Sequence, residues 1–140
     1  MPLVPPPTRA PAALHPLHAT LLAFPIALFP AALLADITYL NSSEMQWSNF
    51  AAWLNAGALV FGGLVLLWGL VSAARGRMSW AYPVLLAVTW VAGLVNAFHH
   101  SRDGWSSVGT TGLVLSIVSA VAVLIAGWLA FATLGLGRRA

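Results

Sequence analysis

The chain has 140 residues, of which 60% are hydrophobic and only 6% are charged. A soluble domain carries about 25% charged residues, so this composition excludes a soluble globular fold and indicates a membrane protein. The absence of cysteine excludes disulfides, iron–sulfur ligation and thiolate zinc within the chain. The net charge of +3 comes from arginines that flank apolar segments instead of forming a stripe, which argues against nucleic-acid binding.

Four long apolar segments fill most of the chain. They are Leu17–Leu40, Phe50–Ala74, Trp80–Phe98 and Val108–Leu136. A helix of about 20 residues crosses a hydrocarbon core about 30 Å thick. The sequence therefore predicts an all-α membrane protein, a bundle of four transmembrane helices. We expect residues 1–16 to be a proline-rich cytoplasmic tail, 17–136 the transmembrane domain and 137–140 a short basic cytoplasmic end.

The stretches inside and between these segments give local predictions. Pro25 and Pro30 should kink the first helix, and the kink serves either packing alone or a ligand pocket. The polar stretch from Asn41 to Asn49 is expected to be a loop, and Ala74–Met78 a tight turn. Small residues at four-residue spacing favour close helix packing, within the bundle or in a homo-oligomer; they include Gly112, Ser116 and Ala120. No internal repeat is evident.

Arginine is distributed unequally between the two sides of the predicted bundle. If the segments cross alternately, one side holds Arg9, Arg75, Arg77, Arg138 and Arg139, and the other holds Arg102. Positive residues favour the cytoplasmic side of a membrane. The sequence therefore predicts a multi-pass membrane protein with both termini in the cytoplasm.

The four histidines lie at the ends of predicted helices and are the candidate cofactor ligands. His15 and His18 begin the first helix, whereas His99 and His100 end the third. Alternate crossings put the two pairs on opposite faces, so they cannot share one metal ion or one haem. His15 and His18 are either ordinary helix-end residues or haem ligands, with Met78 or a second copy supplying the other axial ligand.

A second group of polar residues is expected at the outer face. It consists of Asp36, Asn96, His100, Arg102 and Asp103. Ionisable residues beside membrane helices usually face the bundle interior and pair with each other. One interpretation is a structural network in which Asp36 pairs with Arg102. The others are a haem, metal or quinone site, or proton transfer. No serine has a recognisably spaced base and no phosphate loop is present, so we predict no catalytic residue.

Several short motifs resemble a known family. They are HP at His15–Pro16, FPI at Phe24–Ile26, Asp36 near a helix end, HSRDGWSSVGTTGL at His100–Leu113, and GWL at Gly127–Leu129. Together they resemble the bacterial membrane proteins called domain of unknown function 2231. The resemblance implies four membrane helices in the bacterial inner (cytoplasmic) membrane. Because some relatives are joined to Rieske or cytochrome c modules, it also implies work near an electron-transfer chain. The positions that match family motifs are His15, Asp36, His100, Arg102 and Asp103.

Two functional hypotheses follow. In the first, the chain is a subunit of a respiratory or dehydrogenase-type electron-transfer assembly that binds b-type haem or quinone, or anchors a periplasmic redox partner. In the second, it is a cofactor-free structural or assembly subunit of a larger membrane complex. Both make membrane lipids and other membrane or periplasmic subunits its partners, and both favour a non-catalytic role over a stand-alone enzyme. A transporter is less favoured because no charged path crosses the apolar segments.

Overall fold

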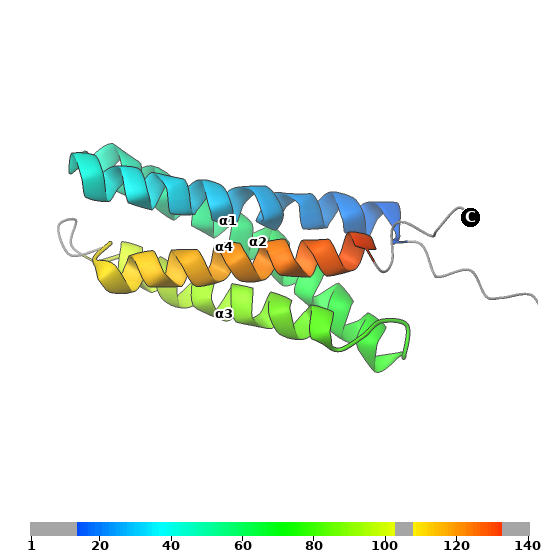
Figure 1. Ribbon diagram of the computed structural model, residues 1–140. Coiled ribbons are helices and arrows are strands. Elements are labelled where there is room, and N and C mark those ends of the chain that lie inside the picture. Colours follow the sequence, from blue (N-terminus) through cyan, green and yellow to red (C-terminus); the bar gives the residue numbers. More distant parts are fainter. Residues whose placement is uncertain (1–13, 103–107, 133–140) are drawn as a thin grey trace, which may run out of the picture.

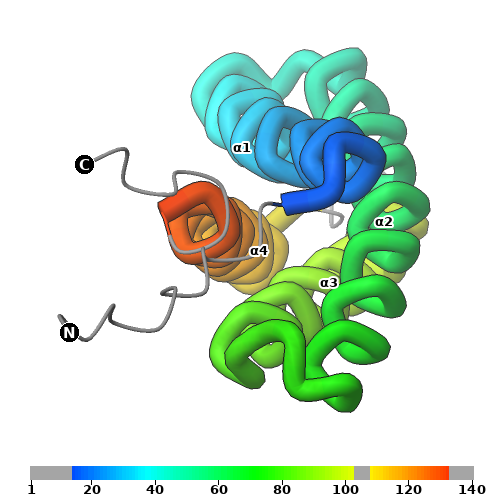
Figure 2. The backbone as a smooth tube through the Cα atoms, turned by 90° about the vertical axis from the view of Figure 1, so that its right-hand side faces the viewer, coloured from blue at the N-terminus to red at the C-terminus, as the bar shows by residue number. Residues whose placement is uncertain are grey.

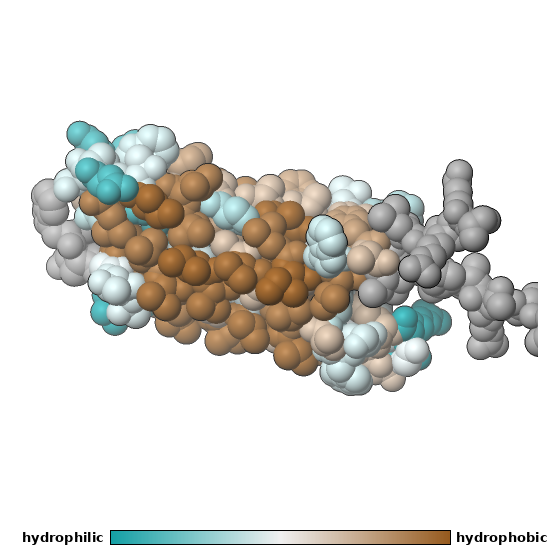
Figure 3. All heavy atoms as spheres, viewed as in Figure 1, coloured by the Kyte–Doolittle hydropathy of each residue, from teal (hydrophilic) through white to brown (hydrophobic). Residues whose placement is uncertain are grey.

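The computed structural model describes residues 14–102 and 108–132. Its helices are α1 (Pro16–Ser42), α2 (Met45–Ala74), α3 (Ala81–His100) and α4 (Thr110–Ala130). Each is long and apolar enough to cross a membrane, which confirms the predicted all-α fold with four membrane helices. Apolar residues cover the middle of the face seen in Figure 3, and polar residues gather toward its two ends.

The connection between α1 and α2 is much shorter than the sequence suggests. The loop expected from Asn41 to Asn49 is wrong in extent, because only Ser43 and Glu44 separate the two helices. The side chains of Asn41 and Ser42 donate to backbone carbonyls one turn earlier, so these polar residues continue α1 instead of ending it. Ser43 then adopts a left-handed conformation (φ 58°), and its N–H donates to a carbonyl of the last turn.

A side-chain cap begins α1. The Nδ1 atom of His15 accepts a hydrogen bond from the backbone N–H of Leu17 at 3.2 Å, and Pro16 occupies the first turn, where its missing N–H costs least. α1 then continues as one helix past both interior prolines. The predicted tight turn after α2 is confirmed. The end of the fourth apolar segment, predicted at Leu136, lies outside the described residues.

The four helices form a ring in which each packs mainly against its two neighbours in sequence order, and α4 closes the ring against α1. Figure 2, seen along the bundle, places α1 and α3 at opposite corners. Neighbouring helices are antiparallel, so α1 and α3 run in the same direction (Figure 1). We call the end that holds Asp36 and His100 the Asp36 end, and the opposite end, which holds His18, the His18 end.

Small and polar residues form much of the interior, and many large apolar residues face outward. The buried stripe of α2 shows this best: Ser48, Ala51, Asn55, Ala58, Gly62, Val65, Gly69 and Ala73. The three-to-four-residue spacing keeps this stripe on one helix face. Lipid chains are as apolar as leucine, so membrane helices gain by close backbone approach rather than by burying large side chains. Trp128, which is 76% exposed, lies on the outer surface.

α1 and α3 meet across the centre of the ring at a constant register. His18 contacts Tyr82, and Asp36 contacts His100; both pairs are 64 residues apart. Between these two contacts, the Phe29 ring fills the space beside Gly93, again with a separation of 64. The steps of 11 and 7 residues along each helix return to nearly the same face. The bundle therefore has three cross-bundle layers, one at each end and one between them.

Candidate functional site

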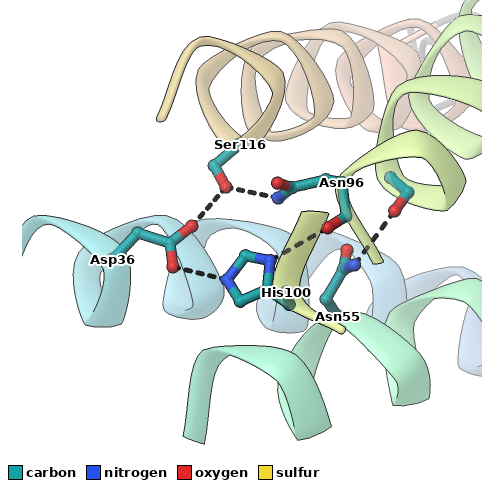
Figure 4. A network of polar contacts seen from close by, with 6 residues as sticks. Asp36, Asn55, Asn96, His100 and Ser116 are labelled. Carbon is teal, nitrogen blue, oxygen red and sulfur yellow. Dashed lines mark hydrogen bonds and ion pairs between the residues drawn. The ribbon is translucent and has the colours of Figure 1, made fainter. Parts of the chain in front are cut away.

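Asp36 is a carboxylate held wholly inside the bundle near the end of α1. Its side chain is 0% exposed, and that of His100 is 1% exposed. The Nε2 atom of His100 lies 2.8 Å from Oδ1, and the hydroxyl of Ser116 donates to Oδ2 (Figure 4). Because the partners come from α3 and α4, this carboxylate joins three of the four helices.

The protonation of the His100 ring follows from its partners. The Nδ1 atom lies 3.0 Å from the backbone carbonyl oxygen of Asn96. A carbonyl oxygen only accepts hydrogen bonds, so Nδ1 carries a hydrogen. The state of the other ring nitrogen, Nε2, then depends on Asp36. Either Nε2–H donates to a carboxylate, or neutral Nε2 accepts from a protonated Asp36.

Ser116 connects Asp36 with the side chain of Asn96. The Asn96 amide nitrogen can only donate, and it lies 2.7 Å from the Ser116 oxygen. The serine therefore accepts from Asn96 and uses its single hydrogen toward Asp36 Oδ2. The direction of this chain of hydrogen bonds is thereby fixed, from Asn96 through Ser116 to Asp36.

These directions leave one proton to be shared between Asp36 and His100. In either form, imidazolium with carboxylate or imidazole with carboxylic acid, the pair carries no net charge. Loss of the proton would leave one buried negative charge, which is costly in an apolar environment. The contacts therefore require one proton between the Asp36 and His100 side chains.

Asn55 brings α2 into the same region. Its amide nitrogen donates to the carbonyl oxygen of Gly93 at 2.9 Å (Figure 4). This bond joins α2 to α3 beside the Phe29–Gly93 layer and is separate from the hydrogen bonds of Asp36, which link α1, α3 and α4. Among the residues that the structure describes, none donates a hydrogen bond to the buried side-chain oxygen of Asn96. This oxygen can accept one further hydrogen bond.

The arrangement is not that of a nucleophilic triad. In such a triad, the serine oxygen bonds to the histidine that removes its proton. Here Ser116 bonds to the carboxylate, and both nitrogens of His100 already have partners. For the same reason, His100 offers no free nitrogen to a haem iron. Among residues 14–102 and 108–132, no group of three or more His, Asp or Glu side chains is placed to hold a metal ion.

The His18 end is the second buried polar contact between α1 and α3. His18 is 1% exposed, and its Nε2 atom lies 2.7 Å from the Tyr82 hydroxyl oxygen. Its other ring nitrogen, Nδ1, is buried and has no hydrogen-bond partner among the described residues. The rings of His15 and His18 both lie against Trp68, with centroids 5.5 and 5.2 Å away. His15 is exposed and its Nδ1 atom caps α1, whereas His18 is buried.

The structure brings together only some of the residues predicted for the outer cluster. Asp36, Asn96 and His100 meet as expected, but the expected pairing of Asp36 with Arg102 is wrong. Both carboxylate oxygens are taken by His100 and Ser116, while Arg102 is exposed. His99 is half-buried and makes none of the contacts of this network. Asp103 lies outside the described residues.

Two residues of these contacts were not predicted as site residues. The sequence indicated Ser116 as a small packing residue and a scattered polar group, although a hydroxyl in the most apolar of the four helices is a signal of hydrogen bonding. Tyr82 is one of two tyrosines in the chain and begins α3. The separation of the two histidine pairs is confirmed, because His18 bonds near the start of α3 and His100 bonds at its end, about 27 Å along the helix.

Fold and site together define a four-helix membrane protein with a buried Asp–His pair at one end. The model of the family described as "Predicted membrane protein (DUF2231)" matches residues 14–132. The chain belongs to this family, as its motifs indicated. The comparisons with curated proteins and with solved structures found no match.

Proposed function

We propose that the protein is a non-catalytic subunit of an electron-transfer assembly in the bacterial cytoplasmic membrane, with both termini in the cytoplasm. In this proposal the Asp36–His100 pair is a proton-holding site that serves a membrane quinone. The observation that carries the proposal is the buried pair itself, in which one proton is shared in two neutral forms. The redox modules implied by the family resemblance point in the same direction.

Quinone chemistry makes use of such a pair. Reduction of a quinone takes up protons as well as electrons, so a site that stores one proton out of water is suited to it. The Ser116 hydroxyl, which donates to Asp36, would stabilise the negative charge left when the proton departs. The unpartnered oxygen of Asn96 would accept a hydrogen bond from a quinol hydroxyl.

Haem receives less support than quinone from the same contacts. His100 uses both ring nitrogens, and His18 uses Nε2 for Tyr82. His15 has its Nε2 atom available, but bis-histidine ligation needs a second ring at the same depth. We therefore place the quinone first and expect no haem bound within a single copy.

The test is the cofactor content of protein purified in a mild detergent. We expect a quinone in the organic extract, in amounts comparable to the protein, and no b-type signal in the reduced-minus-oxidised spectrum. Asn96→Leu and His100→Gln should lose the quinone while the protein stays folded by circular dichroism. Glu44→Gln, an exposed acid near the same end, is the matched control and should keep it. Wild-type protein free of quinone, even when purified with its native lipids, would refute the proposal.

A cofactor-free structural or assembly subunit is the second candidate. It is favoured by the sealing of the polar network, whose Asp36 and His100 side chains are almost fully buried. On this alternative, the network fixes the positions of the helices so that their outer faces can bind neighbouring subunits. Its mark would be co-purification with a large complex, no extractable cofactor, and loss of assembly in Asp36 variants.

A further inference from the structure

The outer surface at the end of α2 has a groove with two chemically different parts. The groove, which we call the α2 groove, has a volume of about 430 Å³ and is lined by Leu64, Leu67, Trp68, Val71, Ser72, Arg75 and Arg77. The leucines and the valine belong to the helix and are apolar. The serine and the two arginines lie where the membrane-spanning segment ends.

The backbone after α2 holds the two arginines in a defined place. The N–H of Gly76 donates to the Ala73 carbonyl at 2.9 Å, and the N–H of Arg77 donates to the Ser72 carbonyl at 2.9 Å. This pair of bonds is the Schellman motif, in which the residue just after the C-cap is left-handed. Gly76 is this residue, with φ 66°. Arg75 and Arg77 therefore flank a rigid helix end.

Neither arginine is neutralised within the part of the chain that the structure describes. The two described carboxylates are Asp36, which is paired with His100, and Glu44. Both lie near the start of α2, and Arg75 follows its end, about 45 Å away along the helix. Two exposed guanidinium groups thus stand beside an apolar groove without a carboxylate partner.

Trp68 forms the inner wall of the groove and is supported from behind. Its ring packs against His15 and His18 at centroid distances of 5.5 and 5.2 Å. Trp68 lies one turn before Ser72 and about two turns before Arg75 along α2. The groove therefore has an aromatic wall beside its apolar part. The groove beside Trp128 is lined only by apolar residues in the part of the chain that the structure describes.

We propose that the α2 groove binds an anionic phospholipid. The acyl chain lies along Leu64, Leu67 and Val71, and the phosphate is bound by the guanidinium groups of Arg75 and Arg77 with the hydroxyl of Ser72 beside them. Guanidinium groups match the geometry of phosphate oxygens, and basic pockets at the membrane surface select anionic headgroups. This inference concerns the His18 end and does not depend on the proposed function.

The first experiment measures which lipid stays bound. The protein is placed in nanodiscs of equal parts phosphatidylglycerol and phosphatidylcholine, released, and analysed by native mass spectrometry. Each surface arginine contributes about fivefold to anionic binding, so wild type should favour phosphatidylglycerol by roughly 25-fold. Arg75→Gln/Arg77→Gln should abolish this preference. Arg138→Gln/Arg139→Gln removes the same charge elsewhere and should keep it. Equal losses in both double variants would overturn the proposal.

A second pair of variants tests the apolar part of the groove. Leu67→Trp fills the groove without changing charge, and Leu34→Trp makes the same change at a similarly exposed position on α1. We expect only Leu67→Trp to reduce lipid retention. Displacement of the lipid by millimolar inorganic phosphate would show a simple anion site, and so would equal retention in both tryptophan variants. Either result would refute a lipid site.

Discussion

The Asp36 end and the His18 end both join α1 to α3 through buried side chains, but they do so with different chemistry. At both ends a buried side chain of α1 reaches across the ring to a residue 64 positions later. At the Asp36 end an ionisable pair is joined by Ser116 and the backbone of Asn96 into a network of several helices. At the His18 end the contact is one hydrogen bond among aromatic rings.

The comparison distinguishes a contact that only holds the helices together from one with additional chemistry. The scaffold needs cross-bundle contacts at a fixed register, and the bond between His18 and Tyr82 already provides one without a carboxylate. An Asp–His pair inside the membrane costs more desolvation than such a contact. The additional chemistry at the Asp36 end is therefore the stronger pointer to function.

The largest effect is expected from removal of the Asp36 carboxylate. Asp36→Leu leaves His100 Nε2 and the Ser116 hydroxyl buried without their acceptor, which should cost about 3–5 kcal/mol of unfolding free energy. Unfolding with SDS in mixed micelles, followed by circular dichroism, measures it. Glu44→Gln, an exposed acid, should stay within about 0.5 kcal/mol of wild type.

The double variant Asp36→Leu/His100→Leu tests whether the pair acts as a unit. Replacement of both members by apolar residues removes the unpaired group as well as the pair, so much of the lost stability should return. A cost near 0.6 kcal/mol for Asp36→Leu alone would instead match an ordinary hydrogen bond between membrane helices. That result would make the two ends energetically alike.

The layer between the two ends should show an intermediate effect. A Cβ atom on Gly93 would lie 2.6 Å from Cε1 of the Phe29 ring, which is itself buried. Gly93→Ala should therefore cost about 1–3 kcal/mol by overpacking. Phe29→Leu should relieve part of that cost in the double variant. Gly62→Ala is the control, since its nearest neighbour would be 3.8 Å away. Equal stability of the two alanine variants would contradict the cross-bundle register.

The sequence predicts the helices well because their signal is local. Four apolar segments are recognisable from composition, and rare charged residues near their ends mark the polar cluster. The partner of Asp36 could not be predicted in the same way. The choice of His100 over Arg102 depends on the register between α1 and α3, which is a property of the packed bundle.

The register between α1 and α3 is hard to recognise in the sequence because the residues that meet are complementary and not alike. Phe29, which has a large side chain, packs against Gly93, which has none. Asp36, an acid, pairs with His100, a base. Equivalent positions therefore carry unlike residues, so no repeat is evident on comparing the two halves. The burial pattern does repeat: Leu22, Pro25 and Phe29 are buried, and so are Leu86, Thr89 and Gly93, each 64 residues later.

The smallest effect is expected at the His18 end. Tyr82→Phe keeps the ring and removes only the hydroxyl that lies 2.7 Å from His18 Nε2. His18 then has no hydrogen-bond partner for either ring nitrogen, because Nδ1 already lacks one. The expected cost is about 1 kcal/mol in the same SDS titration, with Thr20→Val, an exposed hydroxyl bonded within α1, as the control.

The outcome of Tyr82→Phe decides how the two ends should be compared. In a double-mutant cycle, Tyr82→Phe and His18→Phe should show a coupling energy well below that of Asp36 and His100, because only one neutral hydrogen bond joins them. A coupling as large as that of the Asp36–His100 pair would mean that cross-bundle contacts are costly to lose whatever their chemistry. The Asp–His pair would then need no functional explanation, and the cofactor-free structural subunit would become the better account of this protein.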